Sequence, residues 1–247
     1  MNGLEVPWFP IIGNHDTWIY NSTFNEPFPT GDSLFAKTFA AQYARLTQTY
    51  GNDTYFQIGL VNNPEQNIES AFQNFELKYC NMVFYGLDWN SRMAAAPGYR
   101  GAWPGVQLHN FTGGTFDFLE KRLALLSQTK SRTFQIVSLQ HHPYRAPLFV
   151  PSDIYGWAGW QKAAMRTLFE TYFPVEQYFG VIAGHWHRWF NGTAFDEWPT
   201  FRQWETAACK EGGYITIATV SNGNQITDLE RLQAPTSLKQ YHEKSSY

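Results

Sequence analysis

The sequence predicts an α/β fold in which helices pack on a sheet and the C-terminal part is antiparallel. Short apolar runs that end in polar loops alternate with amphipathic helical segments, and residues 201–231 form strand-like runs separated by glycines and an Asn-Gly turn. The chain has 247 residues, of which 43% are hydrophobic and 16% charged, so it can bury a sizeable core. We therefore expect residues 1–247 to form a single domain.

Three segments show the periodicity of amphipathic helices. Residues 33–50 carry aromatic and leucine side chains at helical spacing, and Asp32 and Ser33 at their start are suited to cap a helix. Residues 113–127 and 158–173 repeat the pattern. We expect a helix over each segment.

The predicted strands are short apolar runs bounded by turn residues. Residues 72–88 divide near Cys80 and Asn81, which indicates a hairpin. The other runs that we expect to form strands before residue 201 are 8–12, 54–60, 133–139 and 178–183.

The charge pattern argues against several classes of partner. The net charge is −3 and no run of lysine or arginine stands out, so we expect no nucleic-acid partner. No apolar stretch approaches the roughly 20 residues of a membrane span, and the first residues lack a signal-peptide pattern. The oligomeric state stays open.

The cysteines and the glycosylation triplets bear on the compartment. Only Cys80 and Cys209 are present, which excludes a cysteine zinc site and permits one disulfide. The sequence also has four Asn-x-Ser/Thr triplets, beginning at Asn21, Asn52, Asn110 and Asn191. These triplets favour a secreted glycoprotein, although asparagine-rich loops generate them without modification. We expect Cys80 and Cys209 to pair only in a secreted protein.

Three apolar runs end in loops that together hold five of the seven histidines. A single histidine after a strand is usually capped or solvated. Strands of an α/β sheet, however, deliver their loops to the same edge, where residues distant in sequence can converge. We therefore expect convergence at one sheet edge of the loops Gly13-Asn14-His15-Asp16, His141-His142-Pro143 and Gly184-His185-Trp186-His187.

The residue types in these loops suit a divalent metal. Imidazole nitrogens and an amide oxygen bind borderline ions such as zinc, manganese or iron, and no nucleophilic serine or cysteine lies among them. A metal lowers the pKa of its water towards about 7, and two metals can hold the attacking and departing oxygens of an in-line displacement. The pattern therefore predicts hydrolysis by metal-bound hydroxide.

The same loops carry a resemblance to a known family. Gly-Asn-His-Asp, a histidine two residues before proline, and Gly-His-x-His, in this order, resemble the third, fourth and fifth motifs of calcineurin-like metallophosphoesterases. That superfamily includes purple acid phosphatases, phosphodiesterases and sphingomyelinase-type enzymes. The resemblance implies a four-layer α/β/β/α sandwich, two metal ions at the strand ends, and hydrolysis of phosphoric esters.

Carried over position by position, the resemblance also implies roles for the motif residues. Asn14, His141 and His185 would bind the second metal, and His187 would bind the first. The substrate class would be small-molecule or lipid-headgroup phosphate esters, with monoesters and diesters both open because loops set specificity in this fold.

His15 and Asp16 would act on the substrate rather than on the metals. In the family the histidine stabilises or protonates the leaving oxygen, and we expect Asp16 to orient its ring. His142 has two open roles: it supports the ligands from outside the metal shell, or it exchanges roles with His141. Pro143 biases His142 towards extended backbone and so fixes the relative aim of the two rings.

Residues beside the motifs are weaker candidates. Arginine can bind phosphate, so Arg145 and Arg188 are candidates for contacting a substrate, as is Tyr144. Aromatic side chains near the loops could wall an apolar pocket, although core packing is the favoured role for them; they are Trp18, Tyr20 and Trp186.

Two further motifs of the family, Asp-x-His and Gly-Asp-x-x-Asp, stand upstream of Gly-Asn-His-Asp and do not occur in these residues. The Gly31-Asp32 pair lies downstream and before a helix, so we interpret it as a helix cap. We expect a domain that lacks its first βαβ portion, which predicts that the chain as it stands binds at most one metal, weakly, and hydrolyses phosphate esters far more slowly than a chain with that portion. The alternatives are an enzyme that keeps one metal at Asn14, His141 and His185, and a non-catalytic binding or scaffold module with the same fold.

Overall fold

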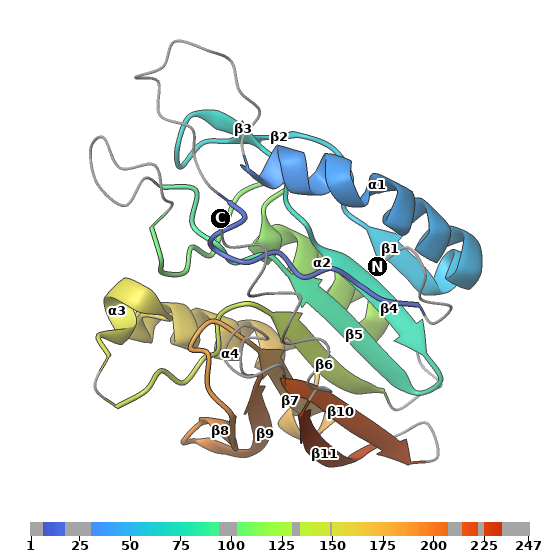
Figure 1. Cartoon of the computed structure of the whole chain (residues 1–247), viewed down its shortest axis with the longest axis vertical. Coiled ribbons are helices and arrows are strands. Elements are labelled where there is room, and N and C mark those ends of the chain that lie inside the picture. The colour runs from blue at the N-terminus through green and yellow to red at the C-terminus, as the bar shows by residue number, and fades with distance from the viewer. Residues whose placement is uncertain are drawn as a thin grey trace.

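The structure is a computed structural model that describes residues 7–17, 31–93, 103–129, 134–148, 150–206, 214–221 and 225–233. Within them, strands form a mixed sheet in the order β1-β4-β5-β6-β7-β9-β8 (Figure 1). The bounds are Thr54–Phe56 (β1), Phe75–Tyr79 (β4), Met82–Leu87 (β5), Gln135–Gln140 (β6), Tyr178–Ala183 (β7), Phe190–Phe195 (β8) and Trp198–Glu205 (β9). Two separate hairpins join Val61–Asn63 (β2) to Ile68–Ser70 (β3) and Tyr214–Ser221 (β10) to Gln225–Gln233 (β11).

The centre of the sheet is parallel and its borders are antiparallel. Strands β5, β6, β7 and β9 run parallel, whereas β1, β4 and β8 pair antiparallel with their neighbours. The register aligns Leu87 with Gln140, Gln140 with Ala183, and Ala183 with Glu205. These four residues end the four parallel strands, so the loops after them leave from one edge of the sheet.

Two helices cover one face of this sheet. They are α2 (Thr115–Ser127) and α4 (Gly159–Tyr172), and a single turn, α3 (Ser152–Tyr155), precedes α4. Alternate side chains of β5, including Val83 and Tyr85, share one buried cluster with Leu119 of α2 and Phe169 of α4. The opposite side chains, such as Met82, belong to a second and smaller cluster.

The helix α1 (Gly31–Tyr50) lies at the border of the sheet that β1 and β4 form, and it is drawn above these strands in Figure 1. Its side chains contact Trp8 and Phe9 of the chain segment 7–13. Trp8 packs edge-on against Phe39, and Phe9 packs on Phe75 with ring centroids 4.9 Å apart. The Trp8 carbonyl accepts a hydrogen bond from Gln42.

The secondary structure confirms most of the predicted elements. The three helices and the strands at 72–88, 133–139 and 178–183 are present with small shifts of their ends. Residues 54–60 form a strand only as far as Phe56, because the chain then turns through Gly59. The strands β2, β3 and β8 and the turn α3 were not predicted. The predicted Asn222-Gly223 turn lies outside the described residues.

The prediction of a strand at residues 8–12 was wrong. The segment forms no ladder with the described strands, and its apolar side chains fill the space between α1 and the sheet instead. An apolar run of this length has the same composition whether it is a buried strand or an extended packing segment.

Three further observations bear on the remaining predictions. Cys80 is exposed in the turn between β4 and β5, and Cys209 lies outside the described residues. None of the helices in the described residues is both long and apolar enough to span a bilayer. Because helices pack against a mixed sheet, the chain is a mixed α/β protein, as the sequence predicts.

Candidate metal centre

The candidate site lies at the edge where the parallel strands end. The loop after β6 begins at His141, and the loop after β7 contains Gly184 to His187. The two loops are joined directly, because Gly184 N–H donates to the His141 carbonyl over 3.0 Å. The loop 13–16 reaches the same edge through Ile12, whose carbonyl accepts a hydrogen bond from Asn90, just beyond β5.

The first loop is a tight turn that presents Asn14. Asp16 N–H donates to the Gly13 carbonyl, and the Asp16 carboxylate accepts the Gly13 N–H over 2.9 Å. The Thr17 hydroxyl donates to the Asn14 carbonyl. Asn14 is buried by this arrangement, whereas His15 and Asp16 are exposed. The Asp16 carboxylate thus closes the turn, and its expected action on His15 stays a prediction.

Ligand atoms from three loops meet at His141. Its Nε2 lies 2.7 Å from Asn14 Oδ1 and 3.1 Å from His185 Nδ1. These residues are 127 and 44 positions apart in the sequence. Three of the four expected metal ligands therefore come together, with the atoms that can bind a metal pointing at one another.

The ring of His185 is held from its far side. Its Nε2 lies 2.9 Å from the carbonyl oxygen of Tyr155 in α3, so that nitrogen carries the proton and Nδ1 carries the lone pair. The backbone of the loop is also constrained, with φ values of 72° at His185 and 54° at His187. Both lie in the left-handed region, which residues other than glycine rarely adopt.

His142 also belongs to this cluster. His141, His142 and His185 each place one ring nitrogen within 4.8 Å of the others, the spacing of a metal-binding group. The His142 ring is completely buried, its Nε2 lies 2.8 Å from the Pro104 carbonyl oxygen, and its centroid lies 4.4 Å from that of His185. The described residues thus contain a histidine cluster that could hold a metal ion.

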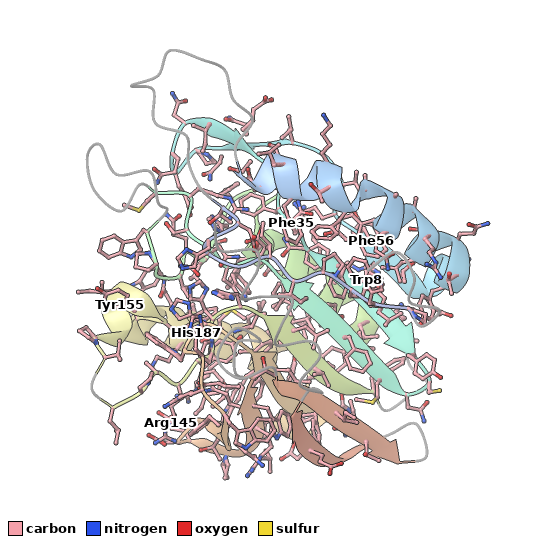
Figure 2. The ribbon with its side chains drawn as sticks, viewed as in Figure 1. Trp8, Phe35, Phe56, Arg145, Tyr155 and His187 are labelled. Atoms are coloured by element: carbon pink, nitrogen blue, oxygen red, sulfur yellow. The ribbon has the colours of Figure 1, made fainter. Side chains whose placement is uncertain are left out.

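The fourth expected ligand, His187, and the expected proton donor, His15, lie close to the cluster but outside it. Burial and the nearby ring of His185 lower the pKa of His141 to about 3. His15 and His187 contribute to the same shift, so both act electrostatically on His141. The expected role of His187 at the other metal stays a prediction. Figure 2 labels His187 and Tyr155 on the same side of the molecule.

The cluster favours neutral imidazole rings. Burial, with smaller contributions from His187 and His15, lowers the pKa of His185 to about 4, and the hydrogen bond to the Tyr155 carbonyl opposes this shift. Burial and the two neighbouring rings also lower the pKa of His142 well below its ordinary value. Metal binding requires the unprotonated nitrogen, so these shifts keep the donor atoms ready near neutral pH.

The other candidates near the motifs have structural roles. Tyr144 is buried in the core against Trp157. Arg145 pairs with Asp196, and the Arg188 guanidinium donates two hydrogen bonds to the buried carboxylate of Glu205. Among the aromatic candidates, Trp186 packs edge-on against His185, whereas Trp18 and Tyr20 lie outside the described residues.

Asp32, which the sequence suggested as a helix cap, lies inside the first turn of α1 and accepts the N–H of the next residue, Ser33. It also accepts the Ala71 N–H and pairs with the buried Arg92, which was not predicted. The carbonyls of Pro104 and Tyr155 that hold the histidine rings were not predicted either. Any residue supplies a carbonyl, so the sequence carries no signal for them.

Comparisons with known proteins add no relative. The chain matches no protein-family model, and no curated protein matches it. The resemblance described above therefore depends on the three motifs and on their convergence.

Proposed function

We propose that this chain is a metal-dependent phosphoric ester hydrolase of the calcineurin-like metallophosphoesterase type, with the four-layer sandwich of that family. The observation that supports this function best is the meeting of Asn14, His141 and His185 at one point. Each residue comes from a different motif loop, and each is the residue that the motif assigns to the second metal. A chance resemblance of three short motifs would not bring their ligand positions into contact.

The residues of the cluster fit a divalent ion. His142 Nδ1 is a buried nitrogen with no hydrogen-bond partner among the described residues, and His185 Nδ1 points into the cluster. Imidazole and amide donors suit zinc, manganese or iron. A bound ion would act as a Lewis acid on phosphoryl oxygens and would lower the pKa of water at the site towards about 7.

The chain itself contributes positioning and proton transfer. Asn14, His141 and His185 would hold the metal, and His187 would hold a second ion or a substrate oxygen beside it. His15 stands next to Asn14 and is exposed, so it can reach the leaving oxygen of a bound ester and give it a proton. We propose small-molecule or lipid-headgroup phosphate esters as substrates.

The first test is hydrolysis of chromogenic aryl phosphate monoesters and diesters with added Zn²⁺ or Mn²⁺. We expect turnover that requires the ion and stops with a chelator. His15→Ala should lower turnover by roughly 10²- to 10⁴-fold, the usual size of general acid catalysis, with metal content unchanged. Hydrolysis that survives the chelator, or that is unchanged in His15→Ala, would contradict the proposal.

One observation favours a second candidate, a phosphate-binding module without catalysis. The metal-binding group found in the described residues contains only imidazoles and no carboxylate to bridge a pair of cations. Two dications about 4 Å apart repel strongly even at an effective dielectric of 20. We therefore expect the chain to bind one ion. Metal-dependent binding of inorganic phosphate without any turnover would favour this candidate.

A secreted location is also part of the proposal. Asn52, Asn110 and Asn191, which begin three of the four acceptor triplets, are all exposed. Asn21, the fourth, lies outside the described residues. A mass shift on treatment of the natively expressed protein with an N-glycosidase would support secretion.

A further inference from the structure

The side chain of His142 presents an unusual buried lone pair. The ring is 0% exposed, and its Nε2 lies 2.8 Å from the Pro104 carbonyl oxygen. A carbonyl only accepts, so Nε2 carries the proton and Nδ1 of the neutral ring carries a lone pair. This Nδ1 is buried and has no hydrogen-bond partner among the described residues. Leaving such an atom unpaired in the protein interior is unfavourable, so a partner is expected.

His185 shows the same arrangement. Its Nε2 donates to the Tyr155 carbonyl, and its Nδ1 points towards His141 Nε2. Histidines that bind metals typically donate the second ring N–H to a carbonyl or carboxylate, which fixes the tautomer and the aim of the ring. His142 and His185 both meet this description, and their centroids are 4.4 Å apart.

The backbone around His142 is also fixed. Its carbonyl accepts hydrogen bonds from the Gln140 amide and from the Trp157 indole. The Gln140 side chain is held in turn by the Trp89 indole. The backbone of His142 is therefore held in place, and turning the ring to aim Nδ1 elsewhere would break its hydrogen bond to the Pro104 carbonyl.

We propose that His142 is itself a metal ligand, binding through Nδ1 and forming with His141 and His185 a three-histidine site for a single divalent ion. This inference rests on the proposed function, since the ion is the one that Asn14, His141 and His185 would hold. A neutral set of imidazoles favours zinc over hard ions such as Mg²⁺ and Ca²⁺, which prefer carboxylate oxygens. The ion bound by this chain is therefore a borderline one.

The test uses the 247-residue chain labelled with ¹⁵N in its histidine rings and titrated with Zn²⁺. We expect one Zn²⁺ ion to bind per chain. The ¹⁵N chemical shift of His142 Nδ1 should then move from the value of an unprotonated nitrogen to that of a metal-bound nitrogen. Mg²⁺ should leave this chemical shift unchanged. His142→Gln should weaken Zn²⁺ binding by more than 100-fold, beyond the 10- to 100-fold usual for residues that only support ligands. Competition with a coloured chelator measures the affinity.

His109→Gln is the matched control. His109 is equally buried, but both of its ring nitrogens have partners, Glu65 at 2.9 Å and the Asn90 carbonyl at 3.0 Å. We expect this variant to bind Zn²⁺ like the wild type. If His142→Gln does not fold, the ¹⁵N titration of the wild type decides alone.

The outcomes separate the two proposals. A His142 Nδ1 resonance that stays in place while Zn²⁺ binds, or a loss of less than 100-fold in His142→Gln, overturns the ligand role and leaves the proposed function standing. A wild-type chain that binds no Zn²⁺ overturns both.

Discussion

Gly13 permits the close approach of the first loop to His141. A Cβ at this position would lie 3.1 Å from both Cε1 and Nδ1 of the His141 ring, and 3.4 Å from an Asp16 oxygen. Nine in ten real Cβ contacts are longer than this, so the ring would have to move by a few tenths of an ångström. The glycine of the Gly-Asn-His-Asp motif is therefore required by space, since its φ is not among the positive ones.

Gly13→Ala should consequently weaken Zn²⁺ binding by about 10-fold, towards the lower end of the effects seen when the support of a metal ligand is disturbed. The displaced His141 ring would no longer aim Nε2 at the common point. Chelator competition measures the change. Gly159→Ala, at the start of α4 with nothing within 4 Å of the new methyl group, is the control and should bind Zn²⁺ normally. Equal affinities for the two variants would contradict this role of Gly13.

The sequence indicated which side chains are candidate ligands, but it did not indicate which backbone carbonyls hold their rings. The loops of His141 and His185 converge as predicted, because both follow parallel strands that end at one edge, whereas Asn14 reaches that edge from a segment that is not a strand. The tautomers of the rings depend on which carbonyls face them, and the sequence does not contain that information. For the same reason the sequence left the role of His142 undecided.

Among the elements, α1 is tied to the sheet by a buried ion network. Arg92 donates to Asp88, just beyond β5, over 2.7 Å and to Asp32 at the start of α1 over 3.1 Å, and all three side chains are at most 1% exposed. Asp32 also accepts the Ala71 N–H. Burial alone would raise the pKa of Asp88, but Arg92, with smaller contributions from Asn90 and His109, outweighs burial and holds that pKa below its ordinary value.

This network predicts a pH dependence of stability. The pKa of Asp88 is lower in the folded than in the unfolded state, so its contribution is fully present above the unfolded value of about 3.9 and is lost as pH falls towards the folded value. Unfolding by urea at a series of pH values should show the loss below about pH 4.

Arg92→Met should destabilise the protein by about 3–5 kcal/mol near neutral pH, because it leaves two carboxylates buried without their partner. The loss should be smaller at low pH, where those carboxylates can protonate. Lys121→Met removes the exposed Lys121–Asp117 pair and is the control, with an effect of at most about 1 kcal/mol. A loss in Arg92→Met that does not vary with pH would contradict the ionic account.

Hydrophobic periodicity predicted the secondary-structure elements best where one face is buried and the other is exposed to solvent. Residues 33–50 met this condition and formed α1. Residues 8–12 did not, because Trp8 and Phe9 pack between α1 and the sheet and the run carries no alternation that separates a strand from an extended segment. The short strands β2 and β3 have three residues each, too few for a pattern to stand out.

For the molecule as a whole, the site exists only once the parallel sheet has formed. The row of strand ends from Leu87 to Glu205 sets the loops side by side, and the candidate ligands come from segments more than a hundred residues apart. The sequence predicted this convergence from apolar runs that end in polar loops, although the run before Asn14 is not a strand, and it could not predict the distances. A metal at this point would connect three loops that the fold otherwise joins by a few hydrogen bonds.

Metal binding should therefore raise the stability of the whole chain. At a free Zn²⁺ concentration 100 times the dissociation constant, binding to the folded state alone adds about 2.7 kcal/mol. For a chain of this size, each kcal/mol raises Tm by about 2–4 °C, so a rise of roughly 5–10 °C is expected. His141→Gln should show almost no rise under the same conditions. His109→Gln, which disturbs a buried histidine away from the cluster, should start from a lower Tm and still show the full rise. If Zn²⁺ raises Tm equally in His141→Gln and the wild type, the ion binds elsewhere, and the three loops do not form the metal centre.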